Sequence, residues 1–76
     1  MTSTSPRWQR PSPGEYRARD DAAEFAARVW RLWPGQWQWQ ATTYGRPLDH
    51  GGARTLAEAR AAAEATYYAV TGRVFA

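Results

Sequence analysis

The sequence predicts a small α+β protein in which a β-hairpin or three-stranded antiparallel sheet packs on one long C-terminal helix. Residues 36–44 alternate between polar side chains and largely apolar ones, which is typical of a half-buried strand. Residues 55–70 open with a capping motif and are rich in Ala, Glu and Arg, which are strong helix formers. At 76 residues the chain has room for a single domain.

The charge of the chain divides it into two parts. All ten basic residues are Arg and the formal net charge is +3; with the many alanines, this bias is typical of a GC-rich genome such as that of an actinobacterium or its phages. The positive excess lies within residues 1–19, which are also rich in Ser and Pro, whereas residues 20–76 are neutral. We therefore predict a disordered arm over residues 1–19 and one α+β domain over 20–76. Trp8 in this arm either folds back on the domain or docks on a partner.

Residues 21–32 are predicted to form an N-terminal helix. Asp20 or Asp21 can cap it, and apolar residues follow at helical spacing. The alternative is a strand over residues 28–33, because VWRLW is rich in residues that favour strands. The apolar residues of the helical pattern are Ala22, Phe25, Ala26, Val29, Trp30 and Trp33.

Residues 36–44 are predicted to form a strand after the turn at Pro34-Gly35. Trp37 and Trp39 share one side, which we expect to be buried. The opposite side is polar, so one face of the sheet is expected to be open to solvent or to a partner. The side chains on this face are Gln36, Gln38, Gln40, Thr42 and Tyr44.

Gly45 ends this strand, and residues 46–54 return as a weaker one, since Pro47 has no N–H to donate and Gly51-Gly52 favours a bulge or bend. Thr55 and Glu58 have the spacing of a capping box, and Gly72 suits the helix end. The predicted apolar helix face, which would receive the tryptophans, comprises Leu56, Ala59, Ala63, Tyr67 and Val70.

Residues 37–65 resemble the arm-type DNA-binding domain of phage tyrosine integrases, a three-stranded sheet packed on one helix. The residues that carry the resemblance are Trp39, Gly45, Gly51, Gly52, Thr55, Glu58 and Ala59. That family reads the DNA major groove with the open face of its sheet, which here implies a role for the polar residues from Gln36 to Tyr44. The layout is also similar to a double-stranded-RNA-binding domain, with Arg54 and Thr55 where that family clusters lysines.

The composition argues against an enzyme. The chain has no Cys and one His, His50, without a nucleophile motif or a Gly-rich phosphate loop beside it. We therefore expect no catalysis, metal, cofactor or small-molecule substrate. No apolar stretch reaches the length of a membrane span, about 20 residues, and the N-terminus lacks a signal-peptide pattern, so we expect a cytoplasmic protein that binds no membrane.

Two classes of partner remain. The first is nucleic acid, bound by a phage-type or regulatory accessory protein through the polar sheet face and the basic arm. The second is a protein, in which case the chain would be an adaptor or inhibitor that docks on a host protein through aromatic and Arg side chains. A homodimer is a variant of the second. The residues predicted for nucleic-acid binding are Arg7, Arg10, Arg17, Arg19, Gln36, Gln38, Gln40, Tyr44, Arg46 and Arg54.

Overall fold

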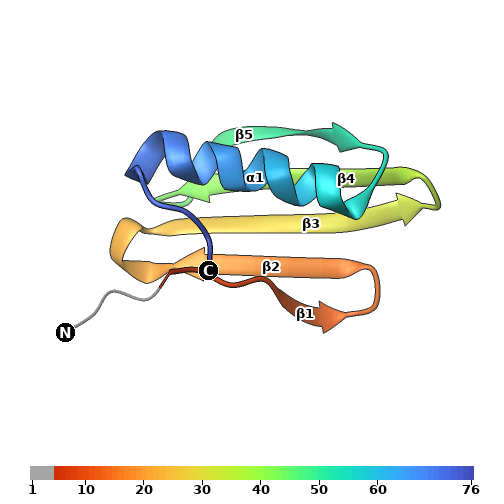
Figure 1. Ribbon diagram of the computed structural model, residues 1–76, viewed down its shortest axis with the longest axis horizontal. Helices are drawn as coiled ribbons and strands as arrows, with labels where there is room; N and C mark the ends of the chain where they lie inside the picture. The colour runs from red at the N-terminus through yellow and green to blue at the C-terminus, as the bar shows by residue number, and fades with distance from the viewer. Residues whose placement is uncertain (1–4) are drawn as a thin grey trace.

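The computed structural model describes residues 5–76 and is an α+β fold, a five-stranded antiparallel sheet with one helix on one face (Figure 1). The strands follow the chain in order across the sheet, β1-β2-β3-β4-β5, so every neighbouring pair is a hairpin. The elements are β1 (Gln9–Ser12), β2 (Glu15–Asp20), the 3-10 turn η1 (Asp21–Ala23), β3 (Phe25–Trp33), β4 (Gln36–Thr43), β5 (Arg46–Ala53) and α1 (Leu56–Thr71). The predicted fold class is confirmed, but the sheet has five strands where two or three were expected.

The prediction of an N-terminal helix over residues 21–32 is wrong, because residues Phe25–Trp33 form the central strand β3. Asp20 does act as a cap, but of the three-residue turn η1, which ends where Glu24 takes a left-handed conformation with φ 51°. From there Phe25, Ala27 and Val29 alternate as buried residues. Antiparallel partners on both sides, β2 and β4, satisfy the strand's backbone along its length, and this tertiary pairing outweighs the helical spacing.

Residues predicted to lie in a disordered arm form β1 and β2 instead. The β1–β2 hairpin turns at Gly14, whose φ of 76° suits glycine. Trp8 folds back on the domain: its Nε1 donates to Glu64 Oε2 at 2.7 Å, and its ring centroid lies 5.1 Å from that of Phe75. The C-terminal residue also pairs with the segment before β1, since the N–H of Ala76 donates to the carbonyl of Pro6. Residues 1–4 of the predicted arm lie outside the described residues.

Helix α1 begins and ends as the sequence predicts. The Thr55 hydroxyl accepts from the N–H of Glu58 at 3.1 Å, while the Glu58 carboxylate accepts from the N–H of Arg54. Gly72 closes the helix with φ 71°. The buried face is Ala59, Ala63 and Tyr67, and its small residues let the helix lie close to Trp39. Val70, predicted on that face, is instead 48% exposed.

Asp20 and Tyr67 form a buried polar pair inside the core. The Tyr67 hydroxyl donates to Asp20 Oδ2 at 2.6 Å, while Asp20 Oδ1 accepts from the N–H groups of Ala22 and Ala23. The hydrogen bond from Tyr67, followed by those backbone groups, outweighs burial and lowers the pKa of Asp20. Burial, and then the bond to Asp20, raises the pKa of Tyr67. The pair ties β2 to α1.

This pair makes the stability depend on pH in a defined direction. Because the folded-state pKa of Asp20 lies below its usual 3.8, its contribution is present above that pH and is lost as the pH falls through the lowered value. The raised pKa of Tyr67 acts on the alkaline side, and its contribution is lost as the pH rises beyond 10.0. Urea unfolding should show Asp20→Asn less stable than the parent at neutral pH, with the difference closing below pH 3.8. Parallel acid profiles for the two proteins would contradict this.

Candidate functional site

The sheet has one face packed on α1 and one face, here called the open face, turned the other way. Trp39, Ala41 and the buried residues of β3 point toward α1. Strand alternation therefore places the intervening residues on the open face. Across the three inner strands β2, β3 and β4 the open face is mostly polar, with the apolar Ala26 and Trp30 on β3.

Strand register arranges the open-face side chains in cross-strand rows. One row, here called the polar row, runs across all five strands, because Gln9 faces Arg17, Arg17 faces Arg28, Arg28 faces Gln40 and Gln40 faces His50. The row on one side of it joins Arg19, Ala26 and Thr42, and the row on the other joins Glu15, Trp30, Gln38 and Gly52.

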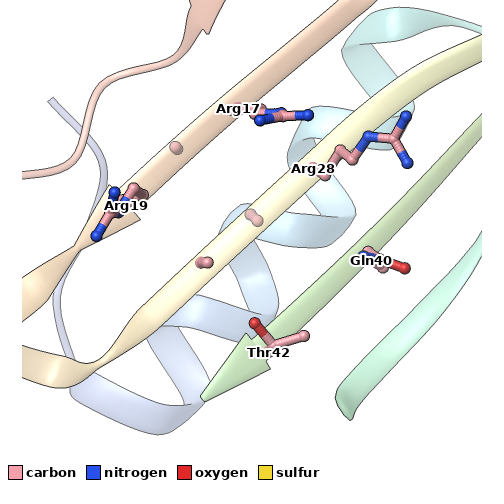
Figure 2. Close-up of a pocket in the computed structure, with 8 residues that line it drawn as sticks. Arg17, Arg19, Arg28, Gln40 and Thr42 are labelled. Atoms are coloured by element: carbon pink, nitrogen blue, oxygen red, sulfur yellow. The ribbon is translucent and has the colours of Figure 1, made fainter. Parts of the chain in front are cut away.

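A depression with a volume of about 230 Å³ lies between the polar row and the row of Ala26 (Figure 2). The small Ala26 side chain leaves this space, and longer polar side chains from three adjacent strands surround it. In Figure 2 they are the labelled Arg17 and Arg19 on β2, Arg28 on β3, and Gln40 and Thr42 on β4. The side chains of three arginines and two neutral hydrogen-bonding residues line this hollow, and the arginine guanidinium groups pair with Glu15 and Asp21 beside it.

Glu15 sets the electrostatic balance of the open face. Its Oε2 accepts from Arg28 Nε at 2.6 Å and lies 3.0 Å from Arg17 Nη2, while Arg19 pairs with Asp21 at 2.9 Å. The hydrogen bond from Arg28 is the main cause that lowers the pKa of Glu15, so this carboxylate is charged at neutral pH. Three arginines against two carboxylates leave one positive charge. The arginine side chains remain accessible, at 59%, 75% and 40% for Arg17, Arg19 and Arg28.

Trp30 adds an aromatic surface to the same face. It is half-buried on β3, opposite Gln38, and the guanidinium carbon of Arg28 lies 4.3 Å from its ring centroid. A guanidinium at this distance from an indole ring makes a favourable cation–π contact. Arg28 is therefore held in place by Trp30 and Glu15 together, which reduces the conformational freedom it would lose on binding a ligand.

The structure brings five of the ten predicted binding residues together on the open face: Arg17, Arg19, Gln36, Gln38 and Gln40. Arg10 lies on the helix side, 6.0 Å from the ring of Tyr16. Tyr44 was placed on the strand face, but it occupies the β4–β5 turn with φ 50°. Arg7 precedes β1, Arg46 faces Thr43 on the helix side, and Arg54 follows β5.

Sequence reasoning missed Glu15, Ala26, Arg28 and Trp30 as neighbours of the glutamines. The alternation of buried Phe25, Ala27 and Val29 was the signal that could have placed Arg28 and Trp30 beside them. The same residues also fit the apolar spacing of a helix, and the helical pattern was the basis of the prediction for this segment. His50 has Gln40 as its cross-strand partner and joins the polar row.

The fold and this face define a class of protein: a small α+β domain whose antiparallel sheet presents a polar, arginine-bearing face away from its helix. Comparison with protein-family models, with curated proteins and with solved structures finds no match for the chain. Within residues 5–76, no helix has both the length and the apolar character to cross a membrane. Across that same range, no group of three or more His, Asp or Glu is placed to hold a metal ion.

Proposed function

We propose that this protein binds nucleic acid through the open face of its sheet. The observation that carries the proposal is the convergence of Arg17, Arg19 and Arg28 with Gln40 and Thr42 around one depression. Guanidinium groups bind phosphate oxygens in a bidentate geometry. Gln and Thr side chains donate to and accept from base edges. The face therefore combines groups that neutralise a phosphate backbone with groups that contact bases.

The source of the charge differs from that expected from sequence. Arg17 and Arg19 were expected to act from a disordered arm, and Arg28 was not expected to act at all. Arg28 on β3 faces Gln40 on β4, and Arg17 and Arg19 lie one strand further away on β2, on the same face as the glutamines. Rigid strands also hold these side chains with less loss of conformational entropy on binding than a disordered arm would suffer.

Removing one open-face charge should weaken binding and its salt dependence. For Arg28→Gln, we expect the slope of log K against log salt to fall in magnitude by about 0.7–0.9, the value for one lost phosphate contact. The matched control is Arg31→Gln, because Arg31 lies on the same strand but faces Trp37 on the other side of the sheet. Fluorescence anisotropy with a labelled oligonucleotide, repeated over a series of salt concentrations, measures the affinity and the salt slope of both variants.

Glu15→Gln should act in the opposite direction. It removes a charged acceptor that occupies Arg17 and Arg28, so affinity should rise and the salt slope should steepen. If Arg28→Gln and Arg31→Gln weaken binding equally, or Glu15→Gln has no effect, the open face is not the contact surface. If no oligonucleotide binds at low salt, the proposed function fails altogether.

A second candidate is a protein-interaction module, favoured by exposed apolar side chains near the β3–β4 turn. Leu32 is 47% exposed and Trp33 is 61% exposed, and exposed aromatic residues are enriched in protein interfaces. On α1, Tyr68 is also exposed, at 58%, whereas its neighbour Tyr67 is buried. This candidate takes precedence if nucleic-acid binding is absent.

A further inference from the structure

We infer that the open face binds its nucleic acid as a single strand, an inference that rests on the function proposed above. It concerns the form of the ligand, which neither the charge of the face nor its glutamines determine. Three features of the face bear on it: the width of the sheet, the pairing of Trp30 with Arg28, and the size of the depression.

The width of the sheet is the first feature. With neighbouring strands about 4.8 Å apart, the backbones of the outer strands of a five-stranded sheet lie about 19 Å apart. The major groove of B-DNA is about 12 Å wide and admits a helix or a two-stranded ribbon. The whole polar row, from Gln9 on β1 to His50 on β5, therefore cannot reach base edges inside that groove. A single strand laid across the sheet can contact the row along its length.

The stacked pair of Trp30 and Arg28 is the second feature. Unpaired bases stack on aromatic rings and on guanidinium planes, whereas the bases of a duplex are already stacked on one another. Trp30 and Arg28 belong to adjacent open-face rows, and both lie beside glutamine side chains, Gln38 and Gln40. An unpaired base can therefore stack on this pair while its edge bonds to an amide of β4.

The depression is the third feature. Its volume of about 230 Å³ is below the range of about 300–1,000 Å³ that is usual for sites that enclose a drug-sized ligand. It has room for one group of a larger ligand, and the arginines that line it can also bond to a phosphate. A stacking surface in one row and an arginine-lined hollow beside the next fit the alternation of base and phosphate along a single strand.

The test compares three labelled ligands of one sequence by fluorescence anisotropy: a DNA strand, an RNA strand and the DNA duplex. A length of about 12 nucleotides suits the range of about 4–16 known for sheet-based single-strand binders. We expect at least one of the single strands to bind about tenfold or more tightly than the duplex. Trp30→Ala should weaken single-strand binding by between about fivefold and a hundredfold, the effect of one lost base stack.

Two further variants separate stacking from charge and from folding. Arg28→Lys keeps the charge but loses the planar group, so single-strand affinity should fall while the salt slope stays unchanged. Trp30→Leu keeps an apolar side chain and replaces Trp30→Ala if circular dichroism shows that the alanine variant is unfolded. The aromatic control is Tyr68→Ala, because Tyr68 is 58% exposed on α1 and lies away from the open face.

The outcomes distinguish this inference from the proposed function. Duplex binding equal to or tighter than that of both single strands, still sensitive to Arg28→Gln, would overturn the inference and leave the proposed function standing. Single-strand preference that is insensitive to the Trp30 variants and to Arg28→Lys would overturn the stacking arrangement. Absence of binding to all three ligands would overturn both.

Discussion

Replacing Tyr67 by alanine is expected to lower the free energy of unfolding by about 3–5 kcal/mol, the range for truncating a buried aromatic side chain. Tyr67 is fully buried, with ring centroids 4.8 Å from Phe25 and 5.3 Å from Phe75. A domain of 76 residues has a total stability of roughly 4–11 kcal/mol at the usual value per residue. The Tyr67→Ala protein should therefore lose a large share of its stability, as urea titration followed by circular dichroism would show.

Tyr67→Phe isolates the hydroxyl group of this residue. The aromatic packing remains, but the buried Asp20 carboxylate loses its donor at 2.6 Å, and we expect a loss of about 1.5–3 kcal/mol. The neighbouring Tyr68→Phe serves as control, since Tyr68 is 58% exposed and its change should stay within about 0.5 kcal/mol. Equal stability of the two phenylalanine variants would show that the bond to Asp20 does not stabilise the fold.

Gly51→Ala is expected to destabilise the protein by about 1–3 kcal/mol, the usual effect of overpacking a core. Gly51 lies opposite Trp39, and a Cβ added there would stand 2.9 Å from Trp39 Nε1 and 3.4 Å from Cε2. Trp39 is 7% exposed and lies under α1, so its ring cannot swing into solvent. The glycine is required because a bulky ring occupies the space beside it.

Gly52→Ala is the matched control for this prediction. A Cβ at Gly52 would meet the Nε2 atoms of Gln36 and Gln38 at 3.3 and 3.4 Å, and these are ends of flexible side chains on the open face. We therefore expect a change of less than about 1 kcal/mol, in either direction, since the alanine also reduces the freedom of the unfolded chain. Thermal or urea unfolding measures the stability of the two variants. A Gly52→Ala protein as unstable as Gly51→Ala would contradict the expected difference between the two faces of the sheet.

The local sequence determined the C-terminal half of this fold. The capping of α1 by Thr55, its end at Gly72 and the alternation of β4 depend on neighbouring residues within one segment, and each has a specific chemical signal. The same alternation placed Gln36, Gln38 and Gln40 on an open face. These predictions depend on no contact between distant segments, which is why the sequence sufficed.

The N-terminal half was decided by tertiary structure. Residues Phe25–Trp33 satisfy both helical and strand spacing, and the choice falls to the strand because β2 and β4 supply hydrogen-bonding partners on both sides. Gln9–Asp20 resembles a disordered arm in composition, yet it pairs as β1 and β2, with Trp8 packed on Phe75 and bonded to Glu64. The prolines and arginines of this segment favour disorder by composition, and the contacts of Trp8 that order it come from residues far away in the sequence.

The candidate site follows the same division. The sequence by itself determined that a row of glutamines would face away from the helix, because strand periodicity alone requires it. It assigned the charge to a separate arm, since nothing local indicates that Arg17 faces Arg28 or that Arg28 faces Gln40. Only the register of β2 and β3 against β4 placed these arginines around the depression, because cross-strand neighbours are set by pairing between segments and not by spacing within one.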